Sequence, residues 1–254
     1  MLEHLKWYLR ARKYKAKVEP QEIDFVIDRV QPGEVAVDIG AYKGAFSYWM
    51  CRRAGRTGQV FAFEPQPLLA DYLRRLARGK SYWHVEQLAL SDREGEAELV
   101  VPLTPGRERV SQMASLHDSW ENLPPGEQRM RVPVRLTTLD AYFGQSSHRP
   151  VKFIKCDAEG HELRVFQGGE QVLREDRPTL LFECENRQPE RAPYVLSVFA
   201  YLEGLGYRGY YFDRQRDMPR PITPQAIEPF YSHNFAFLPE EAGQRPQRAE
   251  VRAA

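Results

Sequence analysis

The chain has 254 residues, of which 42% are hydrophobic and 28% are charged. This balance is typical of a globular protein with a sizeable core, and it excludes collagen-like, coiled-coil and wholly disordered chains. The 36 Lys and Arg residues nearly cancel the 35 Asp and Glu residues. A protein whose main task is to hold DNA or RNA normally has a strong basic excess, so we expect no nucleic-acid partner.

The sequence shows neither a membrane-spanning segment nor closely paired cysteines. No apolar run approaches the ~20 residues that a membrane helix needs, so stable membrane insertion is not expected. The three cysteines are widely spaced and form no Cys-x-x-Cys pair, which supports neither a disulfide framework nor a zinc ribbon. A cytoplasmic location is therefore the expectation.

Residues 1–33 are predicted to form an N-terminal helical segment. Leu2, Leu5 and Leu9 recur at helical spacing among basic residues. A second helix is predicted over residues 21–30, where Pro32-Gly33 ends it. We expect the apolar side of the first helix to pack on the domain or on a second subunit, which leaves a homo-oligomer open. Peripheral contact with a membrane surface is the alternative.

Residues 34–240 are predicted to form one domain in which short apolar strands alternate with amphipathic helices. Strands are predicted over residues 34–40, 59–63, 82–90, 97–101, 130–135, 151–157, 178–183, 206–212 and 234–238, and helices over residues 41–54, 67–78, 136–143, 160–173 and 194–205. The alternation predicts a doubly wound α/β fold with a mostly parallel sheet.

Two polar stretches interrupt or follow this pattern. The stretch 102–128 is a candidate substrate lid, because a loop of this length in a compact domain is usually functional or disordered. Residues 241–254 are charged and poor in apolar residues, so a flexible tail is expected.

The motif VDIGAYKG, residues 37–44, follows the pattern of a ligand-binding turn. Asp38 lies near the carboxyl end of a strand, Gly40 allows the chain to turn against a ligand, and Gly44 belongs to the next helix. The spacing differs from Gly-x-Gly-x-x-Gly, so a pyrophosphate cradle is not expected. The turn suits a nucleoside that carries an amine, received by Asp38, and a carboxylate, received by helix N-terminal amides. A plain strand-to-helix turn without a ligand is the alternative.

The next two strand ends extend this predicted nucleoside site. Glu64 ends the second strand, where an acid is placed to accept both hydroxyls of a ribose, and Pro65 stiffens the turn that presents it. A solvated surface glutamate is the alternative. At the third strand end, the amide of Gln87 and the backbone as far as Ala89 are candidates for contacts with an adenine edge.

Four blocks of sequence, taken together, resemble one family. VDIGAYKG, FEPQP, LALSDREGEAEL and IKCDAEGHELRVFQGG are similar to the signature of FkbM-type S-adenosylmethionine-dependent methyltransferases. The resemblance implies a class I methyltransferase (Rossmann-like) fold with a seven-stranded sheet and S-adenosylmethionine as cofactor. It also implies O-methylation of a hydroxyl on a sugar, a polyketide or another small molecule. Tyr42, in the cofactor turn, stands where the family often has Asn.

The block IKCDAEGHE is where we place the reaction. Asp157 ends its strand at the same sheet edge as Glu64, and Glu159 and His161 follow in the next turn. An alcohol needs a positioned base, and imidazole exchanges a proton near neutral pH, so His161 is the first choice. Asp157 or Glu159 would orient it or act directly. The alternatives are a helix-capping role for His161 and a structural role for Asp157.

Neighbouring polar residues leave further alternatives open. His233 is a second candidate base, and Lys155 is expected to pair with one of the acids. Glu183 ends the following strand and, with Asp157 and Glu159, offers the oxygen ligands that Mg²⁺ takes. We favour hydrogen-bonded acids that line a polar pocket, and we assign no metal ligand.

Other functions remain as competitors to methyl transfer. An NAD(P)-dependent oxidoreductase would use a similar sheet, but the Gly-x-Gly-x-x-Gly fingerprint is missing. A non-catalytic S-adenosylmethionine-binding module, docked on a larger complex by the basic N-terminal helix, is a third hypothesis. Near-zero net charge and the lack of an Asn-Pro-Pro-Tyr-type motif argue against a nucleic-acid methyltransferase.

Overall fold

The computed structural model describes residues 2–103, 114–116, 128–144, 147–148, 150–184, 192–212, 219–222 and 233–240. The strands are β1 Val35–Ile39, β2 Gln59–Phe63, β3 Trp83–Glu86, β4 Ala89–Leu90, β5 Gly95–Leu103, β6 Gln128–Thr137, β7 Val151–Cys156, β8 Thr179–Glu183, β9 Tyr207–Tyr211, β10 Arg220–Pro221 and β11 Asn234–Pro239. The helices are α1 Leu2–Lys13, the π-helix η1 Tyr14–Val18, α2 Pro20–Arg29, α3 Ala45–Ala54, α4 Pro67–Ala77, α5 Leu139–Phe143, α6 Glu162–Gln167, α7 Glu170–Glu175 and α8 Ala192–Gly204.

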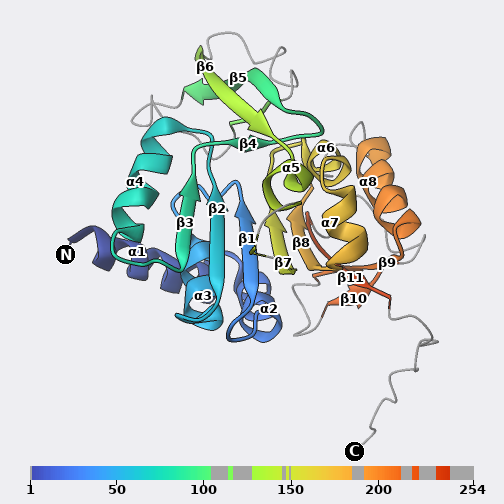
Figure 1. Ribbon diagram of the computed structural model, residues 1–254, viewed down its shortest axis with the longest axis horizontal. Coiled ribbons are helices and arrows are strands. Elements are labelled where there is room, and N and C mark those ends of the chain that lie inside the picture. The colour runs from blue at the N-terminus through green and yellow to red at the C-terminus, as the bar shows by residue number, and fades with distance from the viewer. Residues whose placement is uncertain are drawn as a thin grey trace, which may run out of the picture.

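The main sheet has the order β10-β9-β11-β8-β7-β1-β2-β3. The strands β3, β2, β1, β7 and β8 pair in parallel, whereas β11 is antiparallel to both β8 and β9 (Figure 1). The predicted doubly wound, mostly parallel sheet is confirmed. Within the described residues it has eight strands instead of seven, because the two-residue strand β10 pairs with the outer edge of β9.

Helices cover both faces of this sheet because side chains alternate along each strand. On β1 and β2, Val37 and Phe61 belong to the core under α5, α6, α7 and α8. Ala36 and Val60 belong to the core on the other face, under α1, α2, α3 and α4. Each buried strand therefore contributes to two cores, which explains why the strands are apolar on both sides.

The predicted helix over residues 160–173 is two short helices, α6 and α7, separated by Gly168 and Gly169. A Cβ atom on Gly168 would lie 2.0 Å from the carbonyl oxygen of Ser91. The two backbones approach so closely that only glycine fits, and the helix is interrupted there. The predicted helix 136–143 begins three residues later than expected, at Leu139, because residues 136–137 belong to β6 and the Thr138 side chain caps the helix by accepting a hydrogen bond from Ala141 N.

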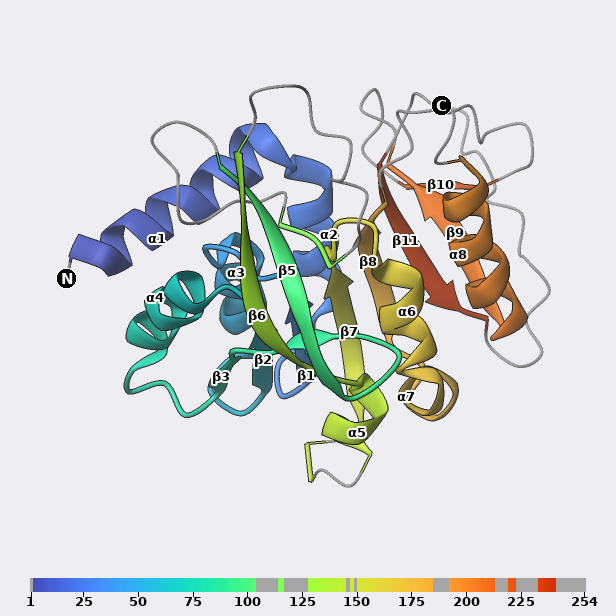
Figure 2. The same ribbon diagram turned by 90° about the horizontal axis from the view of Figure 1, so that it is seen from above.

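A second sheet lies beyond the carboxyl ends of the main strands. The predicted strand 82–90 divides: β3 stays in the main sheet, whereas β4 leaves it and pairs with β6 in the order β4-β6-β5. The long hairpin of β5 and β6 rises above β1, β2 and β7 and crosses over them when seen from above (Figures 1 and 2). Most of the predicted lid 102–128, and the tail 241–254, lie outside the described residues.

The N-terminal helix α1 packs on the domain through two indole groups. Trp7 Nε1 donates to Gly44 O at 2.5 Å, and its ring stacks on Trp83 with centroids 4.6 Å apart. Trp49 Nε1 donates to Ala11 O at 3.1 Å. Within the described residues, no helix combines the length and the apolar character needed to cross a bilayer. Cys51, Cys156 and Cys184 are buried, and none of them is in a disulfide.

Candidate active site

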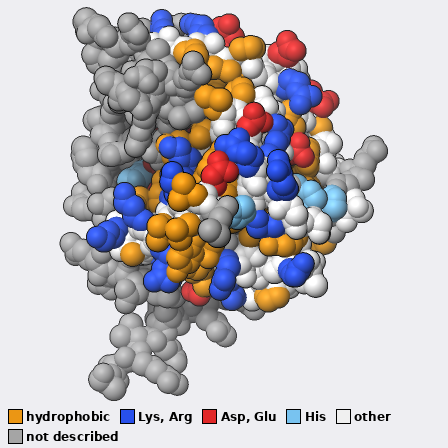
Figure 3. Space-filling view, turned by 90° about the vertical axis from the view of Figure 1, so that its left-hand side faces the viewer, with side chains coloured by type: hydrophobic (Ala, Val, Ile, Leu, Met, Phe, Trp, Pro, Cys, Tyr) orange, Lys and Arg blue, Asp and Glu red, His pale blue; other side chains and the backbone are white. Residues whose placement is uncertain are grey.

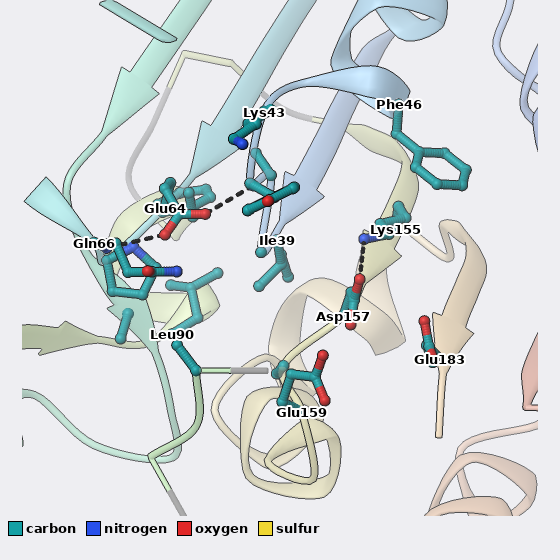
Figure 4. A pocket seen from close by; sticks show the side chains of 18 of the residues that line it. Ile39, Lys43, Phe46, Glu64, Gln66, Leu90, Lys155, Asp157, Glu159 and Glu183 are labelled. Atoms are coloured by element: carbon teal, nitrogen blue, oxygen red, sulfur yellow. Dashed lines mark hydrogen bonds and ion pairs between the residues drawn. The ribbon is translucent and has the colours of Figure 1, made fainter. Parts of the chain in front are cut away.

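A cavity of about 350 Å³ lies at the carboxyl ends of β1, β2, β7 and β8, a size within the range of small-molecule sites (Figure 4). Its walls come from the N-terminal segment, from the turns that follow the strands, and from residues 114–116 under the β5–β6 hairpin. The polar or charged lining side chains are Arg10, Tyr14, Glu19, Tyr42, Lys43, Glu64, Gln66, Lys155, Asp157, Glu159, His161 and Glu183.

Gly40, Glu64 and Asp157 occupy one level at the rim of the sheet. Ile39 pairs with Phe63 on one side and with Cys156 on the other, so the residue after each strand end emerges at the same height. A Cβ atom on Gly40 would lie 2.0 Å from Asp157 O, and Gly40 has φ +70°. Gly40 is therefore required by both the turn and the neighbouring backbone.

The Glu64 carboxylate is held by the backbone on both of its oxygens. Oε2 accepts from Tyr42 N at 2.7 Å and Oε1 accepts from Gln66 N at 2.9 Å. The residue is 2% exposed, and this burial raises its pKa to about 7 even though the two backbone hydrogen bonds oppose the shift. Each oxygen keeps acceptor capacity for a ligand hydroxyl.

Tyr42 adopts a left-handed backbone conformation, with φ +48°. Asn is enriched in this region and bulky residues are rare there, which gives a backbone reason for the Asn that the family often has at this position. The Tyr42 side chain lines the cavity. The Lys43 ammonium lies 4.9 Å from the centre of its ring.

Lys155 and Asp157 form an ion pair at the floor of the cavity, as the sequence predicted for Lys155. Nζ and Oδ2 are 2.9 Å apart, and the Lys155 residue is 6% exposed (Figure 4). Burial alone would lower the pKa of Lys155, but the carboxylates of Asp157 and Asp38 raise it above its ordinary value. Asp157 Oδ1 is buried and has no hydrogen-bond partner in the described part of the chain.

The turn between β7 and α6 is organised by a residue that the sequence did not single out as functional. Glu162 Oε1 accepts from Ala158 N at 3.1 Å and from Gly160 N at 3.0 Å. Tyr194 OH donates to Glu162 Oε2 at 2.9 Å and accepts from Leu163 N at 3.1 Å. This network holds the left-handed backbone of Glu159, φ +50°. The signal for Glu162 was its place in the first turn of the following helix.

His161 belongs to a hydrogen-bonded chain that fixes its tautomer. Ser91 Oγ donates to Asp92 Oδ1 at 3.0 Å, so it accepts from His161 Nε2, which lies 2.9 Å away. The proton is therefore on Nε2 and the lone pair is on Nδ1. Arg164 Nη1 binds Asp92 Oδ2 at 2.6 Å. Against the effect of burial, the hydrogen bonds from Ser91 and Arg164 lower the pKa of Asp92.

Glu19 and Glu183 bring two more carboxyl groups to the Asp157 side of the cavity. Burial raises the pKa of Glu19 to about 7, with Lys155 opposing the shift. Burial, followed by the carboxylates of Asp157 and Glu159, raises the pKa of Glu183 to about 9. Both groups are therefore able to donate hydrogen bonds near neutral pH. Figure 4 shows Glu183, Asp157 and Glu159 gathered opposite Glu64.

The sequence left open a second base, His233, and a metal site at the carboxylates near Asp157. His233 does not line the cavity, and its Nε2 atom lies 4.0 Å from Glu183 Oε1. Among the described residues, no three His, Cys, Asp or Glu side chains are grouped so as to hold a metal ion.

Of the predicted cofactor residues, Gly40, Tyr42, Glu64, Pro65, Ala89 and Asp157 line the cavity, as do the predicted catalytic residues Glu159 and His161. Three others do not. Asp38 is fully buried and accepts from Ser47 Oγ at 2.5 Å. Gly44 faces Trp7 and Leu73. Gln87 accepts from Arg74 Nη1 at 3.4 Å.

Asp38 does not reach the cavity, whereas Glu64 and Asp157 do, and their positions in the strands explain the difference. Asp38 precedes the last residue of β1, and a side chain inside a strand stands perpendicular to the sheet. It therefore faces α3 and not the cavity, where the sequence had placed it to meet an amine. Glu64 and Asp157 each follow the last residue of a strand, where the chain is free to turn toward a ligand.

The strand order β3-β2-β1-β7-β8-β11-β9, with β11 antiparallel and the cavity at the carboxyl ends, defines a class I methyltransferase fold. A family model described as the methyltransferase FkbM domain matches residues 38–208. The chain belongs to this FkbM methyltransferase family. Among curated protein sequences, a search finds no significant match.

Solved structures resemble the chain at the level of the fold. An FkbM methyltransferase from Methylobacillus flagellatus KT is 14% identical with a TM-score of 0.52, covering 90% of this chain and 52% of its own. Aeropyrum pernix fibrillarin with bound S-adenosyl-L-methionine is 10% identical, with a TM-score of 0.48 and coverage of 83% and 68%. A S-adenosylmethionine-dependent O-methyltransferase from Thermotoga maritima is 15% identical, with a TM-score of 0.43 and coverage of 89% and 67%. The chain spans about half the length of the first of these structures.

Proposed function

We propose that the protein is an S-adenosylmethionine-dependent O-methyltransferase that acts on a hydroxyl of a small molecule. The observation that carries the proposal is the shared level of Gly40, Glu64 and Asp157 at the wall of one cavity. Membership of the FkbM methyltransferase family supports the reaction class.

The residues present fit the cofactor at three points. Glu64 is fixed by two backbone N–H groups and retains lone pairs for the two hydroxyls of a ribose. Leu88, Ala89 and Leu90 supply an apolar wall for the base. Asp157 Oδ1, buried without a partner in the described part of the chain, is an acceptor for an ammonium group. When bound, S-adenosylmethionine supplies a methyl group on a positively charged sulfur.

His161 is the proposed base. The Asp92–Ser91 chain holds the proton on Nε2, so Nδ1 is the atom that takes the proton of the acceptor hydroxyl. Asp157 stays paired with Lys155 and contributes negative charge beside the positively charged sulfur. Leu99, Ala114 and Leu116 cover the cavity from the hairpin side and help to exclude water.

Glu19 and Glu183 indicate the chemistry of the acceptor. Carboxyl groups that are protonated near neutral pH both donate and accept hydrogen bonds, which suits an acceptor with several hydroxyl groups. We infer a small polyhydroxylated acceptor, with a sugar as the representative of that class.

Calorimetric titration with S-adenosylmethionine and S-adenosylhomocysteine tests the cofactor. We expect both ligands to bind to the wild-type protein, and we expect Glu64→Ala to lose at least tenfold in affinity for both. If neither ligand binds to the wild-type protein, the proposal is wrong. Transfer of a labelled methyl group is then measured over a panel of hydroxylated acceptors. Binding without transfer to any of them would instead favour a non-catalytic binding module.

His161→Asn tests the base. It removes the proton-accepting nitrogen, so we expect kcat to fall by roughly 10²–10⁴-fold, with cofactor affinity unchanged. A kcat within threefold of wild type would show that His161 is not the base.

A further inference from the structure

Arg10 lines the cavity although it lies outside residues 38–208, the region that the family model matches. Trp7, three residues earlier on α1, is bonded to Gly44 O. Ala11, one residue later, is bonded to Trp49. These two bonds fix Arg10 against the cavity wall, beside the turn that carries Tyr42 and Lys43.

Among the described residues, no acidic side chain forms an ion pair with this guanidinium. None of the ion pairs between described residues involves Arg10 or Lys43. Arg10 Nη1 is buried and has no hydrogen-bond acceptor within the described part of the chain. Its side chain is within hydrogen-bond reach of Tyr72 on α4. A buried guanidinium nitrogen without an acceptor is costly, and a carboxylate is the group whose geometry matches it best.

Positive and negative side chains both line the cavity. Arg10 and Lys43 line the same cavity as Asp157, and Figure 4 shows Lys43 on the side of Glu64 and Lys155 paired with Asp157. The ammonium and carboxylate groups of an amino acid share one carbon atom. A ligand that places its ammonium at Asp157 therefore needs a positive partner close by for its carboxylate.

We propose that Arg10 binds the carboxylate of the amino-acid part of the cofactor, so that the N-terminal helix completes the cofactor site. The proposal rests on the proposed function, because it assumes that S-adenosylmethionine is the ligand. It assigns a binding role to a residue that the matched domain does not contain.

Two nucleosides that differ in the amino-acid part test this assignment by calorimetry. S-adenosylhomocysteine has the carboxylate, whereas 5′-methylthioadenosine lacks the whole amino-acid part. We expect Arg10→Ala to weaken binding of S-adenosylhomocysteine at least tenfold and to change binding of 5′-methylthioadenosine less than twofold. Arg10→Lys should recover part of the loss. Arg12→Ala, an exposed arginine on the same helix, is the matched control and should bind both like wild type.

Each other outcome has a distinct meaning. Equal weakening of both nucleosides by Arg10→Ala would mean that the substitution deforms the site, and it would overturn the proposal. Unchanged affinity of Arg10→Ala for S-adenosylhomocysteine would also overturn it. The carboxylate that binds Arg10 would then belong to an acidic methyl acceptor. If the wild-type protein binds neither nucleoside, the proposed function itself fails.

The outer face of α1 carries a second, independent observation. Leu2, Leu5 and Leu9 are 65%, 52% and 55% exposed, whereas Trp7 and Ala11 on the opposite face are buried. The basic residues Lys6, Arg12, Lys13 and Lys17 are exposed around this leucine row. The acid of this helix, Glu3, is paired with Arg75.

The outer face of α1 could contact a second copy of the chain or a lipid surface, and its positive charge favours an anionic lipid surface. A symmetric dimer through this face would bring two copies of the same basic cluster together, and like charges repel. An anionic lipid surface instead attracts the cations and accepts the leucines at the level of the head groups. Hydrophobic and basic side chains lie side by side on the side of the molecule that carries α1 and α4 (Figure 3). We infer that α1 docks the protein on an anionic lipid surface.

Co-sedimentation with vesicles tests the docking surface. We expect the full chain to bind phosphatidylcholine vesicles that contain phosphatidylglycerol, to bind pure phosphatidylcholine at least tenfold more weakly, and to dissociate in high salt because salt screens the attraction. The double variant Leu5→Asp/Leu9→Asp should lose at least tenfold in affinity. Leu196→Asp, at a 46% exposed leucine on α8, is the matched control and should bind like wild type.

The result that would overturn the lipid surface is equally concrete. Equal binding by the double variant and wild type, or no binding to anionic vesicles, would exclude it. Light scattering gives the oligomeric state of the same samples. A dimer that the double variant converts to a monomer, without vesicle binding, would make this face a subunit interface.

Discussion

The position of an acid relative to the last residue of its strand decides what the carboxylate does in this fold. Glu64 and Asp157, each one residue beyond a strand end, reach the cavity, whereas Asp38, one residue before its strand end, is sealed under α3. All three are at or near a strand end in the sequence. The spacing identifies the correct edge of the sheet, but a shift of one residue separates a ligand-facing acid from a structural one.

Burial of Glu64 predicts a pH-dependent stability. Its pKa rises from an ordinary 4.5 to about 7 in the folded protein, so the folded state holds the proton more tightly than the unfolded state. The contribution to the free energy of unfolding is fully present below about pH 4.5 and is lost as the pH rises through 7. At about 1.4 kcal/mol per pKa unit, we expect a loss of about 2–3 kcal/mol between pH 4.5 and pH 8.

Urea denaturation of wild type and Glu64→Gln at pH 5 and pH 8 measures this loss. The difference in unfolding free energy between Glu64→Gln and wild type should shift in favour of the variant from pH 5 to pH 8. Its altered hydrogen bonds impose the same cost at both pH values, so they do not affect this shift. Glu96→Gln, at an exposed position on β5, should show no such gain. A difference between wild type and Glu64→Gln that is independent of pH would contradict the expected titration.

Gly40 predicts a second effect at the residue scale. In Gly40→Ala, the methyl group meets Asp157 O at 2.0 Å and the backbone keeps φ +70°. Gly79 has φ +78° with no atom within 4 Å, so Gly79→Ala isolates the cost of the left-handed backbone, about 1–2 kcal/mol. We expect Gly40→Ala to cost at least about 2 kcal/mol more. Thermal unfolding of both variants checks the difference, and equal losses would refute the clash.

At the scale of elements, most helices and strands lie where the sequence predicts them, and the exceptions involve contacts between distant segments. The break between α6 and α7 depends on Ser91, more than 70 residues away. The departure of β4 from the main sheet depends on its pairing with β6. Local spacing carries no information about either partner, so the sequence predicted one helix and one strand where the structure has two of each.

The turn between β7 and α6 gives the prediction at this scale. Tyr194→Phe leaves Leu163 N–H without its acceptor and removes a donor from the buried Glu162. We expect a loss of about 1–2 kcal/mol in unfolding free energy and a lower kcat, because the turn carries Glu159 and His161. Tyr201→Phe is the matched control, since its hydroxyl makes only contacts of 3.3 and 3.4 Å.

Urea denaturation and steady-state kinetics on both tyrosine variants separate the two roles. Tyr194→Phe should lose kcat while KM for the cofactor stays near the wild-type value. If Tyr194→Phe and Tyr201→Phe behave alike in both measurements, the network around Glu162 does not organise the turn.

For the whole molecule, the alternation of strands and helices was enough to predict the doubly wound sheet, and the four sequence blocks indicated the family. The composition of the cavity wall was only partly predictable. Arg10, Tyr14 and Glu19 line the cavity, but they reach it because Trp7 is bonded to Gly44, 37 positions along the chain. The amphipathic spacing predicted a packed helix and contained no information on where it would pack.

Trp7→Ala tests whether α1 is an integral wall of the cavity. The indole is 5% exposed, stacks on Trp83 and donates to Gly44 O, so its removal should cost about 3–5 kcal/mol. Because α1 sits at the edge of the domain, we expect the cost to appear first as local opening of residues 2–18, with the strands still protected. Limited trypsin digestion should then cleave at Arg12 or Lys13, and affinity for S-adenosylhomocysteine should fall.

Leu9→Ala, at an exposed position on the same helix, should stay within about 0.5 kcal/mol of wild type. Unchanged digestion of Trp7→Ala would show that α1 is held by other contacts.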